Sequence, residues 1–210
     1  MLKISEVFFS LQGEGKSAGQ PTLFIRLSGC NLRCNFCDTK YHVEGRDLKA
    51  KDINLLSTYK RWTITGGEPL LQQAAINKLI KGFKPEYVEI ETNGTVIPTM
   101  LLVENVNQFN ISPKEKRFQT YKAKTDPFLL NEIDNFIVKF VYSDKLSEKF
   151  IKNITKKYKI KNELVWVMPE GKTKKEQLKK EKEVWNFCLK NGYNFSPRLH
   201  VNLWGNKRKV

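Results

Sequence analysis

The chain of 210 residues has only two histidines and four cysteines, and it lacks any long hydrophobic run. No segment approaches the roughly 20 apolar residues that a membrane-spanning helix needs. The first residues hold a short apolar stretch but no long hydrophobic region and no small-residue cleavage site, so we interpret them as mature chain. We therefore expect a cytoplasmic protein with no membrane partner, and its 40% hydrophobic residues can form a packed core.

Acidic residues are also scarce, because 22 Asp and Glu face 37 Lys and Arg, which gives a net charge of +15. A strongly basic chain invites a nucleic-acid interpretation. Many of the lysines, however, fall between Lys145 and Lys182, where they alternate with the apolar positions of two predicted helices. This pattern favours a solvated surface without direct nucleic-acid binding, while a functional basic face stays open.

The four cysteines are unevenly distributed, since Cys30, Cys34 and Cys37 fall within eight residues and Cys188 is remote. A secreted disulfide framework would spread its cysteines through the chain, so the clustering favours a metal or cluster site in a reducing compartment. Cys188 lies on an apolar helix stripe, and we predict that it is a core residue.

Strand-like runs alternate with helix-like runs along the chain. This alternation predicts a parallel sheet with crossover helices. The expected fold class is α/β, an open, partial TIM-like barrel of about six parallel strands with flanking helices, forming a single domain over residues 1–210. The predicted strands are Thr22–Gly29, Arg61–Thr65, Tyr87–Thr92, Gln108–Ser112, Phe136–Val141 and Leu164–Met168.

Predicted helices have local support in the sequence. Ile76–Phe83 is helix-like, and apolar residues recur at helical spacing between Leu146 and Tyr158. In the last predicted helix Thr173 and Glu176 form a capping box, and Gly192 ends the helix. The apolar stripe predicted for that helix consists of Leu178, Trp185, Cys188 and Leu189.

Polar or glycine-rich segments follow the predicted strands at their carboxyl ends. In parallel α/β folds this edge binds ligands, so the segments indicate one shared site. They read GCNLRCNFCDT, GGEP, ETNGT, SPK and MPEG along the chain.

Cys30-x3-Cys34-x2-Cys37 supplies three thiolates from one loop. Structural zinc usually takes four ligands, whereas three cysteines on a [4Fe–4S] cube leave one iron open for a cofactor or substrate. The zinc alternative is a knuckle built on Cys34, Cys37 and His42, which would make the chain a basic RNA-binding module and no enzyme. The last cysteine of such a knuckle would fall at position 47, which is Asp47.

The cysteine spacing, with Phe36 before the last cysteine, resembles the radical S-adenosylmethionine (SAM) superfamily. The resemblance implies one [4Fe–4S] cluster on the three cysteines, with SAM on the open iron and a 5′-deoxyadenosyl radical as the reactive species. The protein then positions the cofactor, which carries the chemistry. Gly66, Gly67 and Glu68 match the superfamily motif that holds the methionine amino group.

A closer resemblance joins SLQGEG (Ser10–Gly15), FIRL (Phe24–Leu27) and CDT (Cys37–Thr39) with ETNGT, ISPK and LHVNLWGNKR. Together these segments resemble the 7-carboxy-7-deazaguanine synthase family over nearly the whole chain. The resemblance implies a carbon–nitrogen lyase of preQ0 and queuosine biosynthesis. It would contract 6-carboxy-5,6,7,8-tetrahydropterin to 7-carboxy-7-deazaguanine with release of ammonia.

The resemblance also implies roles for single residues. Arg26 offers a planar fork that suits the substrate carboxylate, and Thr39 would bind Mg²⁺, which also relies on water and substrate oxygens. The remaining SAM contacts would be Gly94, Ser112, Pro113, Lys114, Met168, Pro169 and Glu170. The remaining substrate contacts would be Leu11, Gln12, Gly13, Glu14, Thr92, His200 and the carboxylate of Val210.

The expected partners are a small-molecule pterin, a flavodoxin- or ferredoxin-type reductant and a second copy of the chain in a homodimer. An incomplete barrel leaves an exposed edge, which makes a dimer plausible. The alternative within enzymes is a radical SAM activase that takes hydrogen from a glycine of a partner protein. SLQGEG, Arg26 and Thr39 favour the small anionic substrate instead.

Overall fold

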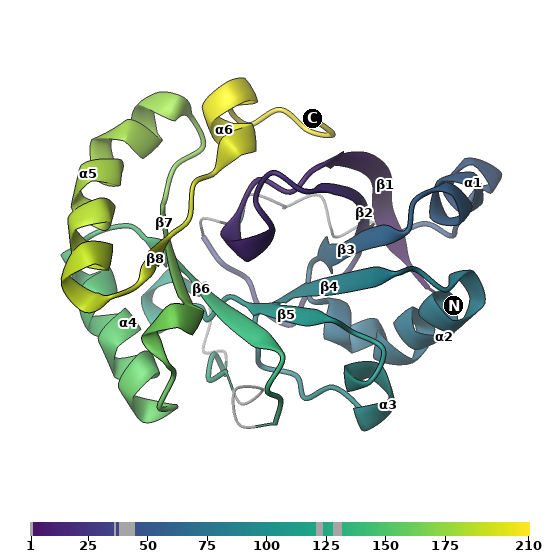
Figure 1. The fold of residues 1–210 in the computed structure, drawn as a ribbon, viewed down its shortest axis with the longest axis horizontal. Helices are drawn as coiled ribbons and strands as arrows, with labels where there is room; N and C mark the ends of the chain where they lie inside the picture. Colours follow the sequence, from purple (N-terminus) through teal and green to yellow (C-terminus); the bar gives the residue numbers. More distant parts are fainter. Residues whose placement is uncertain (1, 36, 38–44, 121–123, 128–131) are drawn as a thin grey trace. The chain divides into compact units, whose positions relative to one another are not determined.

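The computed structural model describes residues 2–35, 37, 45–120, 124–127 and 132–210 (Figure 1). The chain divides into two units: residues 1–10 with 21–135 form the first, and residues 11–20 with 136–210 form the second. Each unit has its own parallel strands and helices. The expectation of a single domain over residues 1–210 stays a prediction.

The sheet of the first unit contains β1 (Ile4–Leu11), β2 (Pro21–Leu27), β3 (Arg61–Gly66), β4 (Tyr87–Thr92) and β5 (Gln108–Ile111). Strands β2 to β5 are parallel and lie side by side in chain order. Leu27 pairs with Gly66 and Thr92 pairs with Ile111 at their carboxyl ends. The segments that follow these strands therefore leave the sheet at one edge.

Alternating residues give this sheet one apolar and one polar face. Ile25, Ile64, Ile90 and Phe109 are fully buried, as expected for β-branched and aromatic residues in a pleated core. The helices of this unit are α1 (Ala50–Thr58), α2 (Gln73–Phe83) and α3 (Met100–Val103), and they flank the strands in Figure 1. Buried residues on the polar face include Thr22, Thr63, Glu89, Gln108 and Asn110.

The second unit contains β6 (Phe136–Tyr142), β7 (Val165–Pro169) and β8 (Asn194–Phe195), which are parallel neighbours. Helix α4 (Lys145–Lys157) connects β6 to β7, and α5 (Lys174–Asn191) connects β7 to β8. These are the crossover connections that parallel strands require. A short helix, α6 (Leu199–Trp204), follows β8.

Helix α5 begins and ends where the sequence predicts. Thr173 and Glu176 form the capping box, and Gly192 caps the other end in the left-handed conformation at φ 66°. The predicted apolar stripe is wrong, however, because Leu178 is 56%, Trp185 53% and Leu189 71% exposed. Of that stripe only Cys188 is buried, and it shares the core-facing side with Gln177, Val184 and Phe187.

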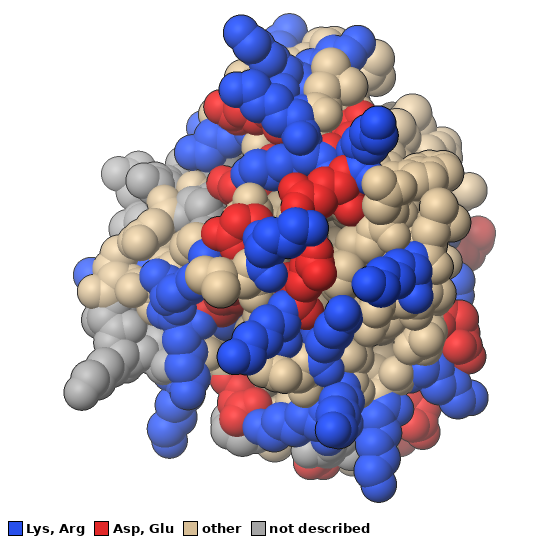
Figure 2. All heavy atoms as spheres, turned by 90° about the vertical axis from the view of Figure 1, so that its left-hand side faces the viewer, with Lys and Arg blue, Asp and Glu red and all other residues tan. Residues whose placement is uncertain are grey.

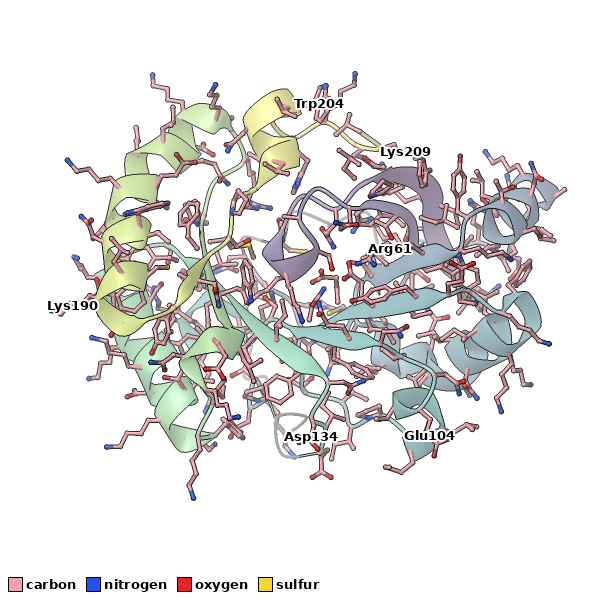
Figure 3. All side chains as sticks on the ribbon, viewed as in Figure 1. Arg61, Glu104, Asp134, Lys190, Trp204 and Lys209 are labelled. Atoms are coloured by element: carbon pink, nitrogen blue, oxygen red, sulfur yellow. The ribbon has the colours of Figure 1, made fainter. Side chains whose placement is uncertain are left out.

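The side of the second unit that carries α4 and α5 is rich in lysine. Lys190 at the end of α5 extends away from the ribbon (Figure 3). Acidic side chains lie among the basic ones on this side (Figure 2), and two of the ion pairs join Lys145 to Glu183 at 2.8 Å and Lys180 to Glu170 at 2.6 Å. The mixture of signs supports the interpretation of a solvated surface.

All six predicted strands are present, and none of their ends differs from the prediction by more than two residues. The described residues contain two further strands, β1 and β8, and the helices α1, α3 and α6 that the sequence interpretation did not include. Within the described part of the chain, no helix combines the length and the apolar character needed to cross a membrane.

Candidate active site

The cysteine loop begins directly after β2, where Gly29 takes a positive φ of 83°. Cys30, Cys34 and Cys37 are partly exposed free thiols without a disulfide. The backbone N–H of Leu32 donates to the Cys30 sulfur at 3.4 Å. Burial raises the pKa of the Cys30 thiol, and this hydrogen bond opposes the rise.

Asparagine side chains tie the start of the cysteine loop to the turn after β4. The Asn31 side chain donates to Thr95 Oγ1 at 2.8 Å and accepts from Asn93 Nδ2 at 3.0 Å. Asn93 in turn accepts from the backbone and hydroxyl of Thr95 at 2.9 and 2.6 Å. The ETNGT motif therefore shapes the cysteine loop through side-chain hydrogen bonds.

A second segment holds the middle of the loop. The Asn35 N–H donates to the Phe118 carbonyl at 2.8 Å, and Thr120 N–H donates to the Arg33 carbonyl at 3.0 Å. The Gln119 side chain accepts from Arg33 N–H at 3.2 Å and donates to the Cys34 sulfur at 3.1 Å. Backbone and side-chain contacts from residues 118–120, which are remote in the sequence, thus hold the Cys34 thiol in place.

The donor set fits a [4Fe–4S] cluster. Across the described residues, no three Cys, His, Asp or Glu side chains converge on a single ion position. A [4Fe–4S] cluster does not require the thiolates to converge on one ion position, because each thiolate binds a different iron. N–H donors at Cys30 and Cys34 are the contacts that stabilise thiolate ligands. Thr39, the predicted Mg²⁺ ligand, lies outside the described residues, as do Phe36 and His42.

The turn after β3 packs directly against the start of the cysteine loop. Gly67 N–H donates to the Leu27 carbonyl at 3.2 Å, and Glu68 N–H donates to the Gly29 carbonyl at 2.8 Å. A Cβ atom on Gly67 would overlap the Gly29 carbonyl group, and Gly66 has a φ of 131°. Glycine is required at both positions by the neighbouring backbone.

Glu68 is fully buried, and its carboxylate is held by hydrogen bonds from its own chain. Its carboxylate accepts from Leu70 N–H at 3.0 Å, from Thr92 Oγ1 at 2.8 Å and from Asn93 N–H at 2.7 Å. Burial raises the pKa of Glu68, and these hydrogen bonds counteract part of the rise. The side chain therefore joins the turn after β3 to the turn after β4.

Hydrogen bonds also join the predicted residues that follow β4 and β5 to one another. Thr92 Oγ1 accepts from Gly94 N–H at 3.1 Å, and the Thr92 carbonyl accepts from Ser112 N–H at 2.8 Å. Lys114 Nζ donates to Ser112 Oγ at 2.8 Å, and Pro113 is buried between them. These residues stand next to Glu68 at the same strand edge.

Arg26 is mostly buried near the end of β2, where its Nε–H donates to Glu6 at 2.9 Å. Glu6 itself is 2% exposed, so the carboxylate fixes the guanidinium from one side. The ion pair with Glu6 fixes the orientation of the Arg26 guanidinium.

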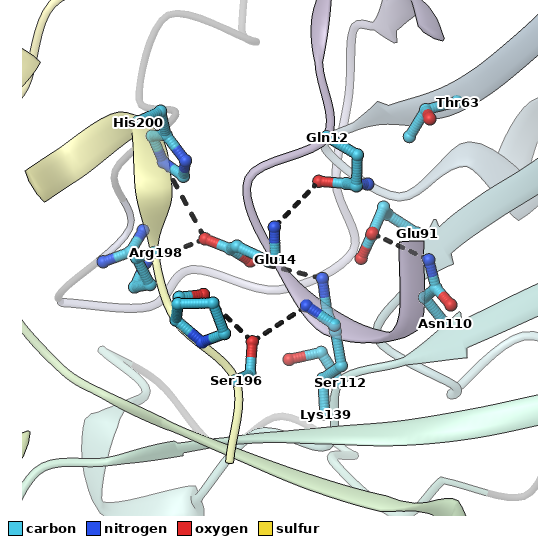
Figure 4. Close-up of polar contacts among 12 residues, drawn as sticks. Gln12, Glu14, Thr63, Glu91, Asn110, Ser112, Lys139, Ser196, Arg198 and His200 are labelled. Atoms are coloured by element: carbon cyan, nitrogen blue, oxygen red, sulfur yellow. Dashed lines mark hydrogen bonds and ion pairs between the residues drawn. The ribbon is translucent and has the colours of Figure 1, made fainter. Parts of the chain in front are cut away.

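In the second unit, the predicted substrate loop is built around the mostly buried carboxylate of Glu14, whose side chain is 15% exposed (Figure 4). Glu14 pairs with Arg198 Nε at 2.8 Å, with Lys139 Nζ at 3.2 Å and with His200 Nε2 at 3.8 Å. Burial raises the pKa of Glu14, but the charges of these three groups outweigh burial and hold the pKa far below its usual range. Glu14 is therefore an internal counter-anion at neutral pH.

The backbone of the same loop is held by the segment after β8. Gly15 N–H donates to Ser196 Oγ at 2.8 Å, and the Gly13 carbonyl accepts from Leu199 N–H at 3.0 Å. The His200 imidazole packs so closely on Gly13 that a Cβ atom there would overlap it. Gln12 is buried, and its Oε1 accepts from Glu14 N–H at 3.3 Å.

Arg198 links this loop to the turn after β7. Its Nη1 donates to the Gly171 carbonyl at 2.7 Å while its Nε–H donates to Glu14. Met168 and Pro169 are buried just before this turn, and Glu170 pairs with Lys180 at 2.6 Å. One guanidinium thus connects the two ligand loops predicted in this unit.

The predicted residues that the structure describes fall into two groups according to the unit that contains them. Leu11 is 53% exposed, and Val210 is partly exposed at the end of the second group. The first group contains Cys30, Cys34, Cys37, Arg26, Gly66, Gly67, Glu68, Thr92, Gly94, Ser112, Pro113 and Lys114. The second contains Leu11, Gln12, Gly13, Glu14, Met168, Pro169, Glu170, His200 and Val210.

Three residues that position these loops were not identified from the sequence. Lys139 is 3% exposed in the centre of β6, and its place inside the apolar run FIVKFV is a signal of a buried ion pair. Arg198 and Gln119 lie in segments without periodicity, where nothing in the local sequence indicates their distant partners.

The chain is similar to known proteins both in sequence and in fold. A family model described as a 4Fe-4S single cluster domain matches residues 11–109. A 7-carboxy-7-deazaguanine synthase from Pyrobaculum aerophilum is 32% identical over 216 residues, which cover 99% of this chain and 96% of the relative. A second one, from Halobacterium salinarum, is 33% identical and covers 97% of this chain and 90% of the relative.

The crystal structure of QueE from Escherichia coli has a TM-score of 0.73 at 20% identity, covering 95% of this chain and 94% of that chain. This likeness confirms the expected α/β fold class, a partial TIM-like barrel of mostly parallel strands. Because the archaeal relatives match over almost their full length at more than 30% identity, the chain belongs to the 7-carboxy-7-deazaguanine synthase family of radical SAM enzymes.

Proposed function

We propose that this protein converts 6-carboxy-5,6,7,8-tetrahydropterin to 7-carboxy-7-deazaguanine with release of ammonia, as a radical SAM lyase of preQ0 and queuosine biosynthesis. The observation that carries the proposal is the arrangement in the first unit. There, the start of the cysteine loop, the buried Glu68 and the turn after β4 lie together at the carboxyl edge of a parallel sheet. That edge is the ligand-binding edge of α/β folds.

Cys30, Cys34 and Cys37 would hold the [4Fe–4S] cluster. When bound, the cluster and SAM supply one-electron cleavage of the sulfonium and hence radical chemistry. The chain's own contribution is to orient the groups around them. Glu68 joins two turns by accepting hydrogen bonds from Leu70, Thr92 and Asn93, and its carboxylate has acceptor capacity left for the methionine ammonium.

The remaining SAM contacts are proposed residue by residue. Gly66 and Gly67 give the backbone of their turn its close approach to the cysteine loop. Lys114, which is fixed by Ser112, offers an ammonium donor. The full proposed set is Gly66, Gly67, Glu68, Gly94, Ser112, Pro113, Lys114, Met168, Pro169 and Glu170.

The pterin carboxylate is assigned to Arg26. Its guanidinium is held by Glu6, so less conformational freedom is lost when a second anion binds. Gln12 and the backbone of Leu11 and Gly13 would pair with the flat pterin edge, and Thr92, His200 and Val210 complete the proposed contacts. Glu14 serves the substrate indirectly, since its carboxylate is engaged by Arg198 and Lys139.

Mg²⁺ at Thr39 belongs to the proposal, with substrate oxygens and water as the other ligands. We further propose a cytoplasmic homodimer that receives electrons from a flavodoxin- or ferredoxin-type protein. A pterin-dependent rise in Mg²⁺ affinity that is lost in Thr39→Ala would support the metal assignment.

The test is anaerobic reconstitution of the full chain, followed by incubation with SAM, dithionite, Mg²⁺ and 6-carboxytetrahydropterin. Mass spectrometry should detect 7-carboxy-7-deazaguanine for the wild type and for Cys188→Ala, and none for Cys34→Ala. 5′-Deoxyadenosine without the deazaguanine product would refute the substrate assignment alone. A colourless chain that binds zinc and no iron would refute the radical SAM assignment as well.

A further inference from the structure

Gln119 makes two contacts with the cysteine loop through one amide. Its Oε1 accepts from Arg33 N–H at 3.2 Å, and its Nε2 donates to the Cys34 sulfur at 3.1 Å. Cys34 and Gln119 also face one another across an antiparallel bridge. The side chain therefore spans from the backbone of residue 33 to the thiol of residue 34.

The orientation of this amide follows from its partners. The Arg33 N–H is a donor, so it must meet the oxygen of the amide, and the NH₂ group is then directed at the sulfur. A flipped amide would place two N–H donors against each other. The contact with Cys34 is consequently an N–H···S hydrogen bond.

The segment around Gln119 is itself held in place. Asn35 and Thr120 make backbone hydrogen bonds that join it to the cysteine loop, at 2.8 and 3.0 Å. Arg117 pairs with Glu115 at 2.6 Å and stacks over the Phe118 ring at 4.2 Å. Gln119 is partly buried in this frame, so its amide is pre-positioned relative to the thiol.

Hydrogen bonds to the sulfur ligands are one of the factors that set the reduction potential of an iron–sulfur cluster. A donor stabilises negative charge on the thiolate, and a reduced cluster carries one more negative charge than the oxidised form. The donor therefore favours the reduced form and raises the potential.

We propose that Gln119 is a positioning residue that raises the reduction potential of the cluster by donating a hydrogen bond to the Cys34 thiolate. The inference rests on the proposed function, because it requires Cys34 to be a cluster ligand. In this proposal Gln119 changes how readily the cluster is reduced. It is not assigned a contact with SAM or with the pterin.

The test uses the full chain reconstituted anaerobically without SAM or pterin, with the reduced cluster measured by electron paramagnetic resonance at a series of solution potentials. Gln119→Glu keeps an oxygen for Arg33 N–H and replaces the donor by a carboxylate oxygen. Gln119→Leu removes donor and acceptor without adding charge. Lys116→Gln, at an exposed position, is the control that changes the local charge by the same amount as Gln119→Glu.

We expect the equilibrium constant for reduction to fall about tenfold in Gln119→Leu, by the size of one charge-assisted hydrogen bond. That is a shift of about 59 mV for a one-electron couple. Gln119→Glu should shift further in the same direction and by more than Lys116→Gln. Iron and sulfide content is measured for each variant, so the shift refers to chains with equal cluster loading.

Fully loaded Gln119 variants with the wild-type potential would overturn the inference and leave the proposed function intact. Failure of both variants to load a cluster would overturn it too, since Gln119 would then serve to hold the loop. A wild-type chain that loads no cluster would refute the proposed function together with the inference.

Discussion

Arg198 and Glu14 are 184 residues apart in the sequence, yet the Arg198 Nε–H donates to the Glu14 carboxylate at 2.8 Å. The same guanidinium donates from Nη1 to the Gly171 carbonyl at 2.7 Å. Arginine can make both bonds because its donors lie in a rigid plane. The loop at 12–14 and the turn after β7 are thus fixed to one side chain, and both are assigned to ligands.

Glu14→Gln should destabilise the chain by about 3 kcal/mol, because it leaves the buried Lys139 ammonium without its carboxylate. Urea unfolding of the full chain at neutral pH measures this change. Glu163→Gln, at an exposed site in the same unit, is the matched control and should change stability little. Equal midpoints for the two variants would contradict the internal role of Glu14.

The stabilisation by Glu14 should depend on pH with a defined sign. The pKa of Glu14 is lowered in the folded chain from an ordinary value of 4.5, so the folded state favours the ionised form. Its contribution is therefore fully present above that value and is lost as the pH falls below it. Unfolding measured over decreasing pH should show a steeper loss of stability for the wild type than for Glu14→Gln.

Arg198→Lys should weaken the binding of both SAM and the pterin. A lysine keeps the positive charge beside Glu14 but cannot donate in two fixed directions, so either Glu14 or Gly171 loses its partner. We expect KM for both SAM and the pterin to rise, by about tenfold for one lost charge-assisted hydrogen bond. Lys209→Arg, at an exposed position in the same C-terminal segment, should leave both constants unchanged. A rise for one ligand alone would show that Arg198 serves a single loop.

Cys188 should differ from the other cysteines in every cluster measurement. It is 3% exposed, and burial raises the pKa of its thiol to about 12, so it stays protonated at neutral pH. Cys188→Ala should keep the full iron and sulfide content and lose about 1 kcal/mol of stability. Iron analysis of this variant beside Cys30→Ala, Cys34→Ala and Cys37→Ala checks the assignment, and a loss of iron in Cys188→Ala would contradict it.

Gly13→Ala should impair pterin binding, because the new Cβ would overlap the His200 imidazole and displace either the loop or the ring. Gly82→Ala in α2 is the matched control, since a Cβ there meets no atom within 4 Å. In that helix the change should increase stability by about 0.5–1 kcal/mol. Pterin KM and thermal unfolding of both variants separate the two effects, and an unchanged KM in Gly13→Ala would count against the contact.

Local patterns predicted the secondary structure where the elements are long and periodic. The capping box at Thr173 and the glycine at 192 gave the ends of α5, because both act within one helical turn. The exposed positions of Trp185 and Leu189 could not be predicted in this way, since burial depends on which helix face meets the strands. Strand β8 has only two residues, too few for a period.

For the candidate site, too, local patterns predicted some features, and others depended on contacts between remote segments. Motifs at strand ends predicted which residues share an edge, because parallel register brings those ends level. The partners that complete the site come from remote segments, as Gln119 does for Cys34 and Arg198 for Glu14. A single sequence contains no local signal for such pairs, whereas Lys139 within an apolar run does signal a buried charge.

Gly66, the last residue of β3, and Gly67 constrain how the sequence of such chains can diverge. Gly66 and Gly67 are demanded by the backbone of residues 27–29, whatever occupies the ligand edge. Descendants that abandon radical chemistry and lose their cysteines should therefore still keep both glycines, because the first unit needs them to fold. Retention of this pair alone would then mark common ancestry, while activity would have to be judged from the three thiols.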